Sequence, residues 1–109
     1  MKQRTVRLGA IGAALLSHIL PAAADAIDGD WCREDGKRMS IQGPAIVTPG
    51  GGKTQGDYSR HAFAYVIPPG EAGAGNNVAI TLRGEHLAEA REGDAGALQE
   101  WRRCQPGIS

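Results

Sequence analysis

Short runs in which polar and apolar side chains alternate follow one another along most of the chain. Residues 38–42 (Arg-Met-Ser-Ile-Gln) alternate in this way, and residues 78–82 (Val-Ala-Ile-Thr-Leu) do so again. Alternation with a period of two indicates strands that bury one face. The same reasoning predicts further strands at residues 30–33, 45–48, 58–67 and 98–104.

Glycine and proline are concentrated between these runs, where they predict turns. The chain contains 16 Gly and 6 Pro. Residues 85–91 favour a helix by intrinsic propensity, but an isolated helix of that length would be marginally stable. We therefore expect a strand there, joined to the last strand through a turn at residues 93–96.

A series of about seven short strands separated by turns predicts an all-β fold. The simplest arrangement is a small antiparallel meander, in which each strand pairs with the next one along the chain. Closing this sheet into a barrel or a twisted sandwich would hide its edges, which otherwise invite aggregation.

The N-terminus has the three parts of a secretory signal peptide. Basic residues at positions 2, 4 and 7 precede a mostly apolar run over residues 8–20, and small residues follow it. We expect signal peptidase to cut between Ala26 and Ile27, with a cut after Ala24 as the alternative. Residues 1–26 are then removed.

Residues 27–109 remain as a single small β domain, which we expect in the periplasm or outside the cell. The whole chain has 12 basic and 12 acidic residues and a formal net charge of zero, so a nucleic-acid partner is not expected. No apolar stretch is long enough to span a membrane, so we expect no membrane span in the mature chain.

Two cysteines, Cys32 and Cys104, lie near the two ends of this domain. In an oxidising compartment an even number of cysteines predicts disulfides, and two cysteines allow one pairing. The alternatives are two free thiols or a metal site shared with a histidine. The disulfide would tie the first strand to the last, which predicts that these two strands lie side by side.

Several short motifs carry a resemblance to known proteins. They are Gly29-Asp30-Trp31-Cys32, Thr48-Pro49-Gly50-Gly51, the segment Tyr58, Arg60, His61, Phe63 and Tyr65, and the terminal Trp101-Arg102-Arg103-Cys104. Together they resemble a group of small, uncharacterised exported bacterial proteins, and in outline the chain is similar to lipocalin-like barrels. In such barrels a Gly-x-Trp motif lies on the first strand, and a late arginine packs across it. The resemblance implies these roles for Gly29, Trp31 and either Arg102 or Arg103, and it implies no activity.

No catalytic constellation stands out. Gly50-Gly51-Gly52-Lys53-Thr54 ends like a phosphate-binding loop, but Val47 replaces the first glycine and no helix follows, so a hairpin loop is expected. Ser59 and His61 would lie roughly 6.5–7 Å apart on one strand face, too far for a nucleophile and its base. His61 and His86 lack metal-ligand spacing. We therefore expect that the protein is not an enzyme and that it binds no cofactor or metal.

His61, Phe63 and Tyr65 share one face of the predicted strand at residues 58–67. In a domain with few aromatic residues, Phe63 and Tyr65 are best explained as core, with His61 near the rim. The functional alternative is that this face lines the mouth of a barrel and contacts a small ligand.

Two long loops provide the other candidate site, because rigid scaffolds often present function on loops. Their candidate residues are Gly50, Gly51, Lys53, Pro68, Pro69 and Glu71. The sequence thus predicts a monomeric, exported, non-enzymatic domain that binds a partner protein in the manner of an inhibitor. The alternative is a carrier of a small apolar ligand, with a cavity lined by Phe63, Tyr65, Ile80 and Leu82.

Overall fold

The computed structural model describes residues 26–105, which form nine strands and no helix. The predicted signal peptide lies outside these residues, apart from Ala26. The strands are β1 (Gly29–Cys32), β2 (Arg38–Gln42), β3 (Ala45–Val47), β4 (Lys53–Gln55), β5 (Asp57–Ser59), β6 (Ala62–Val66), β7 (Asn77–Leu82), β8 (Leu87–Glu92) and β9 (Gln99–Arg103).

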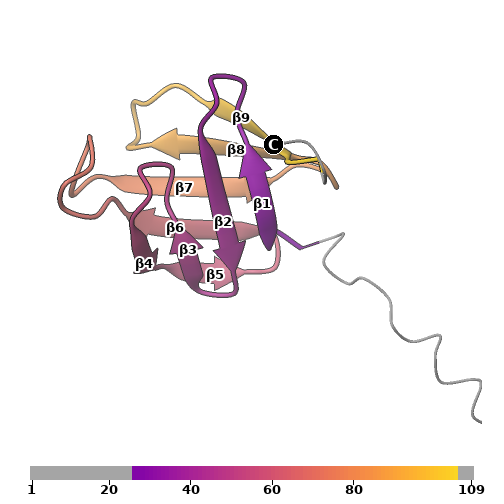
Figure 1. Cartoon of the computed structure of the whole chain (residues 1–109), viewed down its shortest axis with the longest axis horizontal. Helices are drawn as coiled ribbons and strands as arrows, with labels where there is room; N and C mark the ends of the chain where they lie inside the picture. The colour runs from indigo at the N-terminus through magenta and orange to yellow at the C-terminus, as the bar shows by residue number, and fades with distance from the viewer. Residues whose placement is uncertain (1–25, 106–109) are drawn as a thin grey trace, which may run out of the picture.

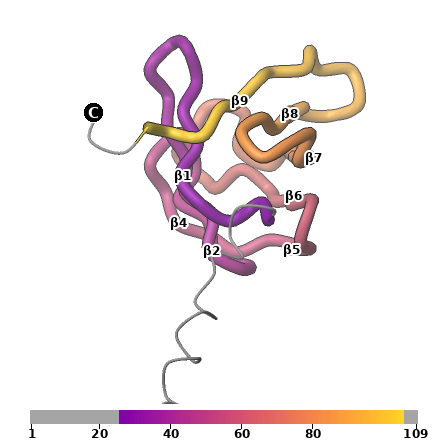
Figure 2. The backbone as a smooth tube through the Cα atoms, turned by 90° about the vertical axis from the view of Figure 1, so that its right-hand side faces the viewer, coloured from indigo at the N-terminus to yellow at the C-terminus, as the bar shows by residue number. Residues whose placement is uncertain are grey.

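All nine strands belong to one antiparallel sheet in the order β4-β3-β2-β1-β9-β8-β7-β6-β5. Figure 1 shows β1 to β4 crossing in front of the more horizontal β5 to β9. In the perpendicular view of Figure 2, β1, β2 and β4 lie on one side and β5 to β8 on the other. The sheet is therefore a nearly closed barrel, and the predicted all-β meander is confirmed.

The two ends of the sheet, β4 and β5, are separated in the chain only by Gly56. β4 pairs with β3, whereas β5 pairs with β6. The amide of Gly56 donates a hydrogen bond to the Pro44 carbonyl at 2.9 Å. A Cβ atom at Gly56 would lie 2.2 Å from the carbonyl oxygen of Ala64. Only glycine fits where the chain crosses from one end of the sheet to the other.

The interior is built from alternating strand positions, as the sequence pattern predicts. In β7, for example, Val78 and Ile80 are buried and the intervening residue is exposed. The buried cluster consists of Ile27, Trp31, Met39, Ile41, Ile46, Phe63, Tyr65, Ile67, Val78, Ile80, Ala88, Ala90 and Trp101. The small aromatic content of the chain is thus concentrated in its core.

The prediction of one strand over residues 58–67 is wrong. The chain turns at Arg60 and His61, so β5 ends at Ser59 and β6 begins at Ala62. The carbonyl of His61 accepts a hydrogen bond from the amide of Leu82 at 2.8 Å. This turn contains no glycine, proline, asparagine or aspartate, and Ser59, whose hydroxyl donates to the carbonyl of Ala62 at 3.3 Å, is its one weak signal in the sequence. Residues 53–55, predicted as loop, form β4.

The strand expected over residues 85–91 is confirmed as β8. It pairs with β7 on one side and with β9 on the other. Its alanines Ala88 and Ala90 are buried, with 0% and 5% exposure. Pairing on both sides and burial of one face therefore override the helical propensity of this segment.

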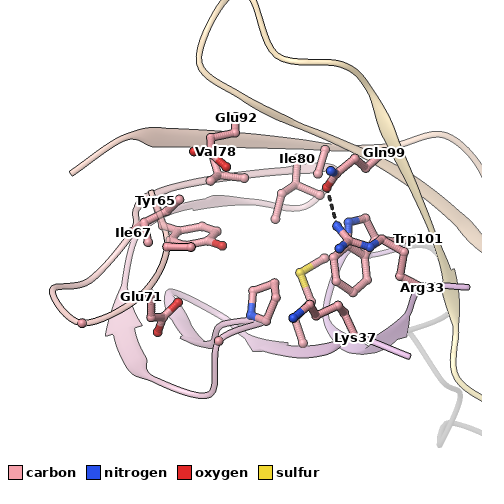
Figure 3. Close-up of a pocket in the computed structure, with 16 residues that line it drawn as sticks. Arg33, Lys37, Tyr65, Ile67, Glu71, Val78, Ile80, Glu92, Gln99 and Trp101 are labelled. Carbon is pink, nitrogen blue, oxygen red and sulfur yellow. Dashed lines mark hydrogen bonds between the residues drawn. The ribbon is translucent and has the colours of Figure 1, made fainter. Parts of the chain in front are cut away.

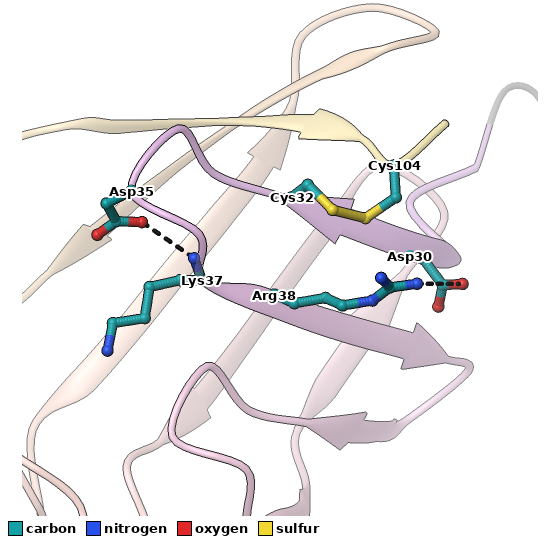
Figure 4. Close-up of a disulfide and its surroundings, with 6 residues drawn as sticks. All are labelled: Asp30, Cys32, Asp35, Lys37, Arg38 and Cys104. Carbon is teal, nitrogen blue, oxygen red and sulfur yellow. Dashed lines mark hydrogen bonds and ion pairs between the residues drawn. A yellow bond between two sulfur atoms is a disulfide. The ribbon is translucent and has the colours of Figure 1, made fainter. Parts of the chain in front are cut away.

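The predicted disulfide joins Cys32 to Cys104, with an S–S distance of 2.04 Å and a Cα–Cα distance of 5.1 Å (Figure 4). β1 and β9 are neighbours in the sheet, with Cys32 opposite Arg102. The amide of Cys104 also donates to the carbonyl of Asp30 at 3.0 Å. The bridge thus reinforces the contact between the first and last strands, as expected.

Arg103 takes the place that the lipocalin-like resemblance implied for a late arginine. Its guanidinium carbon lies 4.4 Å from the centre of the Trp31 ring. A Cβ atom at Gly29 would lie 2.6 Å from Arg103 Nη1, and the φ of Gly29 is +129°. A glycine, a tryptophan and an arginine are therefore required together, whereas Arg102 is exposed.

The segment before β1 covers this end of the barrel, which we call the closed end. Ile27 is fully buried and its amide donates to the carbonyl of Arg60 at 2.8 Å. Its own carbonyl accepts from the indole Nε1 of Trp31 at 2.9 Å. Asp28 accepts hydrogen bonds from the amide of Gly43 at 2.8 Å and from the hydroxyl of Tyr58.

Candidate functional site at the open end of the barrel

The opposite end of the barrel, which we call the open end, contains a cavity of about 410 Å³. It lies among the β1–β2 turn, the β3–β4 turn and the loops that follow β6 and β8. Figure 3 shows side chains from both halves of the barrel around it. Its lining residues are Arg33, Lys37, Met39, Pro49, Gly50, Tyr65, Ile67, Gly70, Glu71, Ala72, Val78, Ile80, Ala90, Glu92, Gln99 and Trp101.

The inner wall of the cavity is apolar. Met39, Ile80 and Trp101 line it and are only 1–2% exposed. The indole N–H of Trp101 is buried and has no acceptor among residues 26–105. A second groove of about 410 Å³ runs over the outside of β2 and β3, but most of its lining residues are polar or exposed. The open-end cavity is therefore the better candidate for a binding site.

Tyr65 places a polar group inside this apolar space. Its side chain is 6% exposed, and Figure 3 shows its hydroxyl directed into the cavity. No residue of the described chain forms a hydrogen bond with this hydroxyl. Burial, together with the negative charges of Glu71 and Glu92, raises the pKa of Tyr65 to about 12. The phenol is therefore neutral at physiological pH and can donate or accept one hydrogen bond.

Glu71 connects the two loops that the sequence analysis proposed as a candidate site, the β3–β4 turn and the β6–β7 loop. Its carboxylate accepts hydrogen bonds from the Thr48 hydroxyl at 2.8 and 2.7 Å and from the amide of Gly52 at 3.1 Å. Thr48 is itself 1% exposed. The β3–β4 turn and the β6–β7 loop thus form one continuous rim around the cavity.

The glycine-rich turn holds this carboxylate closely. A Cβ atom at Gly50 would lie 2.5 Å from the Glu71 carboxylate, and one at Gly52 would lie 2.4 Å from its Oε2. Between them, Gly51 has a φ of +94°. The segment that resembled a phosphate-binding loop is a hairpin turn, as expected, and it surrounds a carboxylate of its own chain.

Arg33 lies on the opposite side of the cavity and already has interaction partners within the chain. It forms an ion pair with Asp35 at 2.6 Å and hydrogen-bonds the side chain of Gln99. Its guanidinium carbon lies 5.0 Å from the centre of the Trp101 ring. The hydrogen bond from Arg33 lowers the pKa of Asp35 to about 2 and raises the pKa of Arg33. Arg33 therefore acts as a cover for Trp101.

The sequence predicted the members of this site only in part. Of the four expected cavity residues, Tyr65 and Ile80 line it, whereas Phe63 and Leu82 do not. His61 lies in the exposed turn between β5 and β6 and does not line the cavity. The predicted strand that contains it is divided at this turn.

The remaining loop candidates are placed around the rim or beside it. Gly50 and Glu71 line the cavity, whereas Gly51, Pro68 and Pro69 lie in the same two loops. Lys53 is exposed on β4 and does not line the cavity. Sequence analysis missed several lining residues, among them Lys37, Glu92, Gln99 and Trp101. Lys37, Glu92 and Gln99 lie at or beside strand ends, on the inward side of the alternating pattern, and Trp101 is the inward residue at the centre of β9.

Residues 26–105 contain no group of three or more His, Cys, Asp or Glu side chains that could hold a metal ion. The same residues include no helix that could cross a membrane. Comparison with protein-family models, with curated proteins and with solved structures found no match for the chain.

Proposed function

We propose that this protein binds a small, largely apolar ligand in the open-end cavity and acts as a carrier. The observation that supports this proposal is the cavity itself, with its volume of about 410 Å³, an apolar inner wall that includes Met39, Ile80 and Trp101, and polar side chains around it. Ligand sites are commonly clefts of about 300–1,000 Å³, mostly apolar with a few polar groups. Tyr65 supplies one such polar group.

The lining residues favour binding over covalent catalysis. They include no serine, cysteine or histidine. The mechanism in which a serine or cysteine attacks with a histidine as its base therefore has no candidate residues in this lining. The Cys32–Cys104 disulfide supports action in an oxidising compartment, and we propose the periplasm or the extracellular space.

The second candidate is the inhibitor-like function, carried by the rim. The hydrogen bonds between Glu71, Thr48 and Gly52 hold two exposed loops in one arrangement. A loop that is ordered before binding loses less entropy when a partner protein docks. This observation favours a binding role for the rim that would be independent of the cavity.

A titration with a neutral apolar probe tests the carrier proposal. We expect 1-decanol to change the intrinsic tryptophan fluorescence saturably, because Trp101 forms part of the cavity wall. Ala90→Phe should weaken binding by at least tenfold, because Ala90 lines the cavity and is 5% exposed. Ala79→Phe is the matched control, since Ala79 is an outward-facing position on β7.

Absence of saturable binding, or equal binding by the two variants, would overturn the carrier proposal. The rim would then be tested directly. A partner protein that binds stoichiometrically to the unaltered protein, and not to the Glu71→Ala variant, would establish the second candidate.

A further inference from the structure

We propose that the open-end cavity selects ligands that carry a protonated amine, bound between Tyr65, Glu71 and Glu92. The inference rests on the proposed carrier function and adds the charge and position of the ligand's polar group. The apolar body of the ligand would lie against Met39 and Ile80.

The first argument is uncompensated negative charge at one side of the cavity. Glu71 and Glu92 both line it, and Figure 3 shows them on the same side as Tyr65. The hydrogen bonds to Glu71 come from a hydroxyl and an amide, and Glu92 accepts from the Asn76 side-chain amide at 2.8 Å. Within residues 26–105, neither carboxylate forms an ion pair.

The chain keeps both carboxylates in place. Gly52 donates to Glu71, as described above. A Cβ atom at Gly73 would lie 2.5 Å from Oε2 of Glu92, so the β6–β7 loop packs directly on this side chain. Carboxylates fixed in this way can meet a cation with little further loss of side-chain entropy.

The second argument is the unpartnered hydroxyl of Tyr65. It is directed into the cavity from a side chain that is 6% exposed, and no hydrogen bond joins it to another residue within 26–105. An ammonium group is a pure donor with up to three N–H bonds. It could donate to the phenolic oxygen and to a carboxylate at once.

The opposite side of the cavity provides the competing possibility. Arg33 is neutralised by Asp35, so it offers little attraction to an anionic ligand. Lys37 lines the cavity, and the described chain places no carboxylate within ion-pair distance of its ammonium group. The test must therefore also include a ligand that carries a carboxylate.

The test compares three ligands with the same apolar chain: decylamine, 1-decanol and decanoate. Each is titrated at pH 7 into the purified protein with its disulfide intact, below the concentration at which the ligand self-associates. We expect decylamine to bind at least tenfold more tightly than 1-decanol, and decanoate more weakly than both. A charge-assisted hydrogen bond of ordinary strength accounts for a difference of this size.

Glu92→Gln should reduce the preference for decylamine over 1-decanol by about tenfold, because it removes the charge and keeps an oxygen for Asn76. Tyr65→Phe should also reduce this ratio. Glu100→Gln is the matched control, since Glu100 is an exposed carboxylate on β9 that does not line the cavity, and it should leave the ratio unchanged.

The possible failures are distinguishable. If decylamine and 1-decanol bind equally, if decanoate binds most tightly, or if Glu92→Gln leaves the ratio unchanged, the amine selectivity is wrong while the carrier function stands. If none of the three ligands binds, the carrier function fails as well.

Discussion

At the closed end, the side chain of Arg103 connects the two ends of the described chain. It donates to the carbonyls of Glu85, Asp28 and Ala26 at 2.5, 2.7 and 2.6 Å, and it covers Trp31. Burial lowers the pKa of Arg103 from its usual value, although the nearby Asp28 opposes this shift. The guanidinium remains charged throughout the physiological range, because the ordinary pKa of arginine lies far above it.

Arg103→Ala should lower the free energy of unfolding by about 2–4 kcal/mol, because it removes two part-buried hydrogen bonds, to the carbonyls of Asp28 and Ala26, and uncovers Trp31. Arg102→Ala is the neighbouring control and should change it by less than about 0.5 kcal/mol, since Arg102 is exposed. Urea unfolding of both variants measures the difference. Similar losses in the two variants would contradict the role assigned to Arg103.

The same contacts bear on where signal peptidase would cut. Ala26 is 7% exposed and its carbonyl is bound by Arg103. A cut after Ala26 would remove this acceptor and place a charged ammonium on the fully buried Ile27, which is costly. We therefore expect the alternative cut, after Ala24. The intact mass of the protein after processing by signal peptidase checks this prediction, and a chain that begins at Ile27 would refute it.

At the scale of elements, the contact between the β3–β4 turn and the β6–β7 loop defines the rim. Alternation and turn residues located both segments in the sequence. Their meeting through Glu71 could not be predicted, because Thr48 and Glu71 are 23 positions apart and the contact depends on how the barrel curves. The single strand predicted over residues 58–67 failed for a related reason, since only the pairing of β5 with β6 defines that turn.

Glu71→Ala should loosen both loops together, because it removes the acceptor for Thr48 and Gly52. Amide hydrogen exchange over residues 48–53 and 67–76 should become at least about tenfold faster, the change expected for the loss of a charge-assisted hydrogen bond. Glu34→Ala, at an exposed turn position, is the control. Faster exchange in one loop only would show that Glu71 does not couple them.

At the scale of the whole molecule, two features connect distant parts of the barrel. The disulfide secures the contact of β1 with β9, and Gly56 connects the two ends of the sheet. The disulfide was predictable from the number of cysteines together with the predicted signal peptide. The second was not, because Gly56 is one of 16 glycines and its tight contact with Ala64 exists only in the folded barrel.

Gly56→Ala should destabilise the protein by about 1–3 kcal/mol, because the added methyl group would overlap the carbonyl of Ala64 and force the backbone to shift. Gly84→Ala is the matched control, since no atom lies within 4 Å of its added Cβ. Thermal unfolding followed by circular dichroism compares the two variants. Equal melting temperatures would argue against a structural requirement for glycine at position 56.

Replacing both cysteines by serine should lower the free energy of unfolding by about 4 kcal/mol in the chain-entropy model for a bridge that spans 72 residues. For a domain of this size we expect the melting temperature to fall by more than about 10 °C. Calorimetry of the double variant checks this. A fall of only one or two degrees would mean that the folded barrel does not depend on the bridge.

The sequence by itself determined the features that depend on local pattern and composition. Alternating side chains predicted most of the strands, glycine and proline predicted most of the turns, and Cys32 and Cys104 allowed only one bridge. Only the tertiary structure decided which side chains meet at the open end. Tyr65, Glu71 and Glu92 come from three different parts of the chain, and the curvature of the sheet brings them around one cavity. Strand periodicity specifies the face of each residue, but barrel closure decides its neighbours.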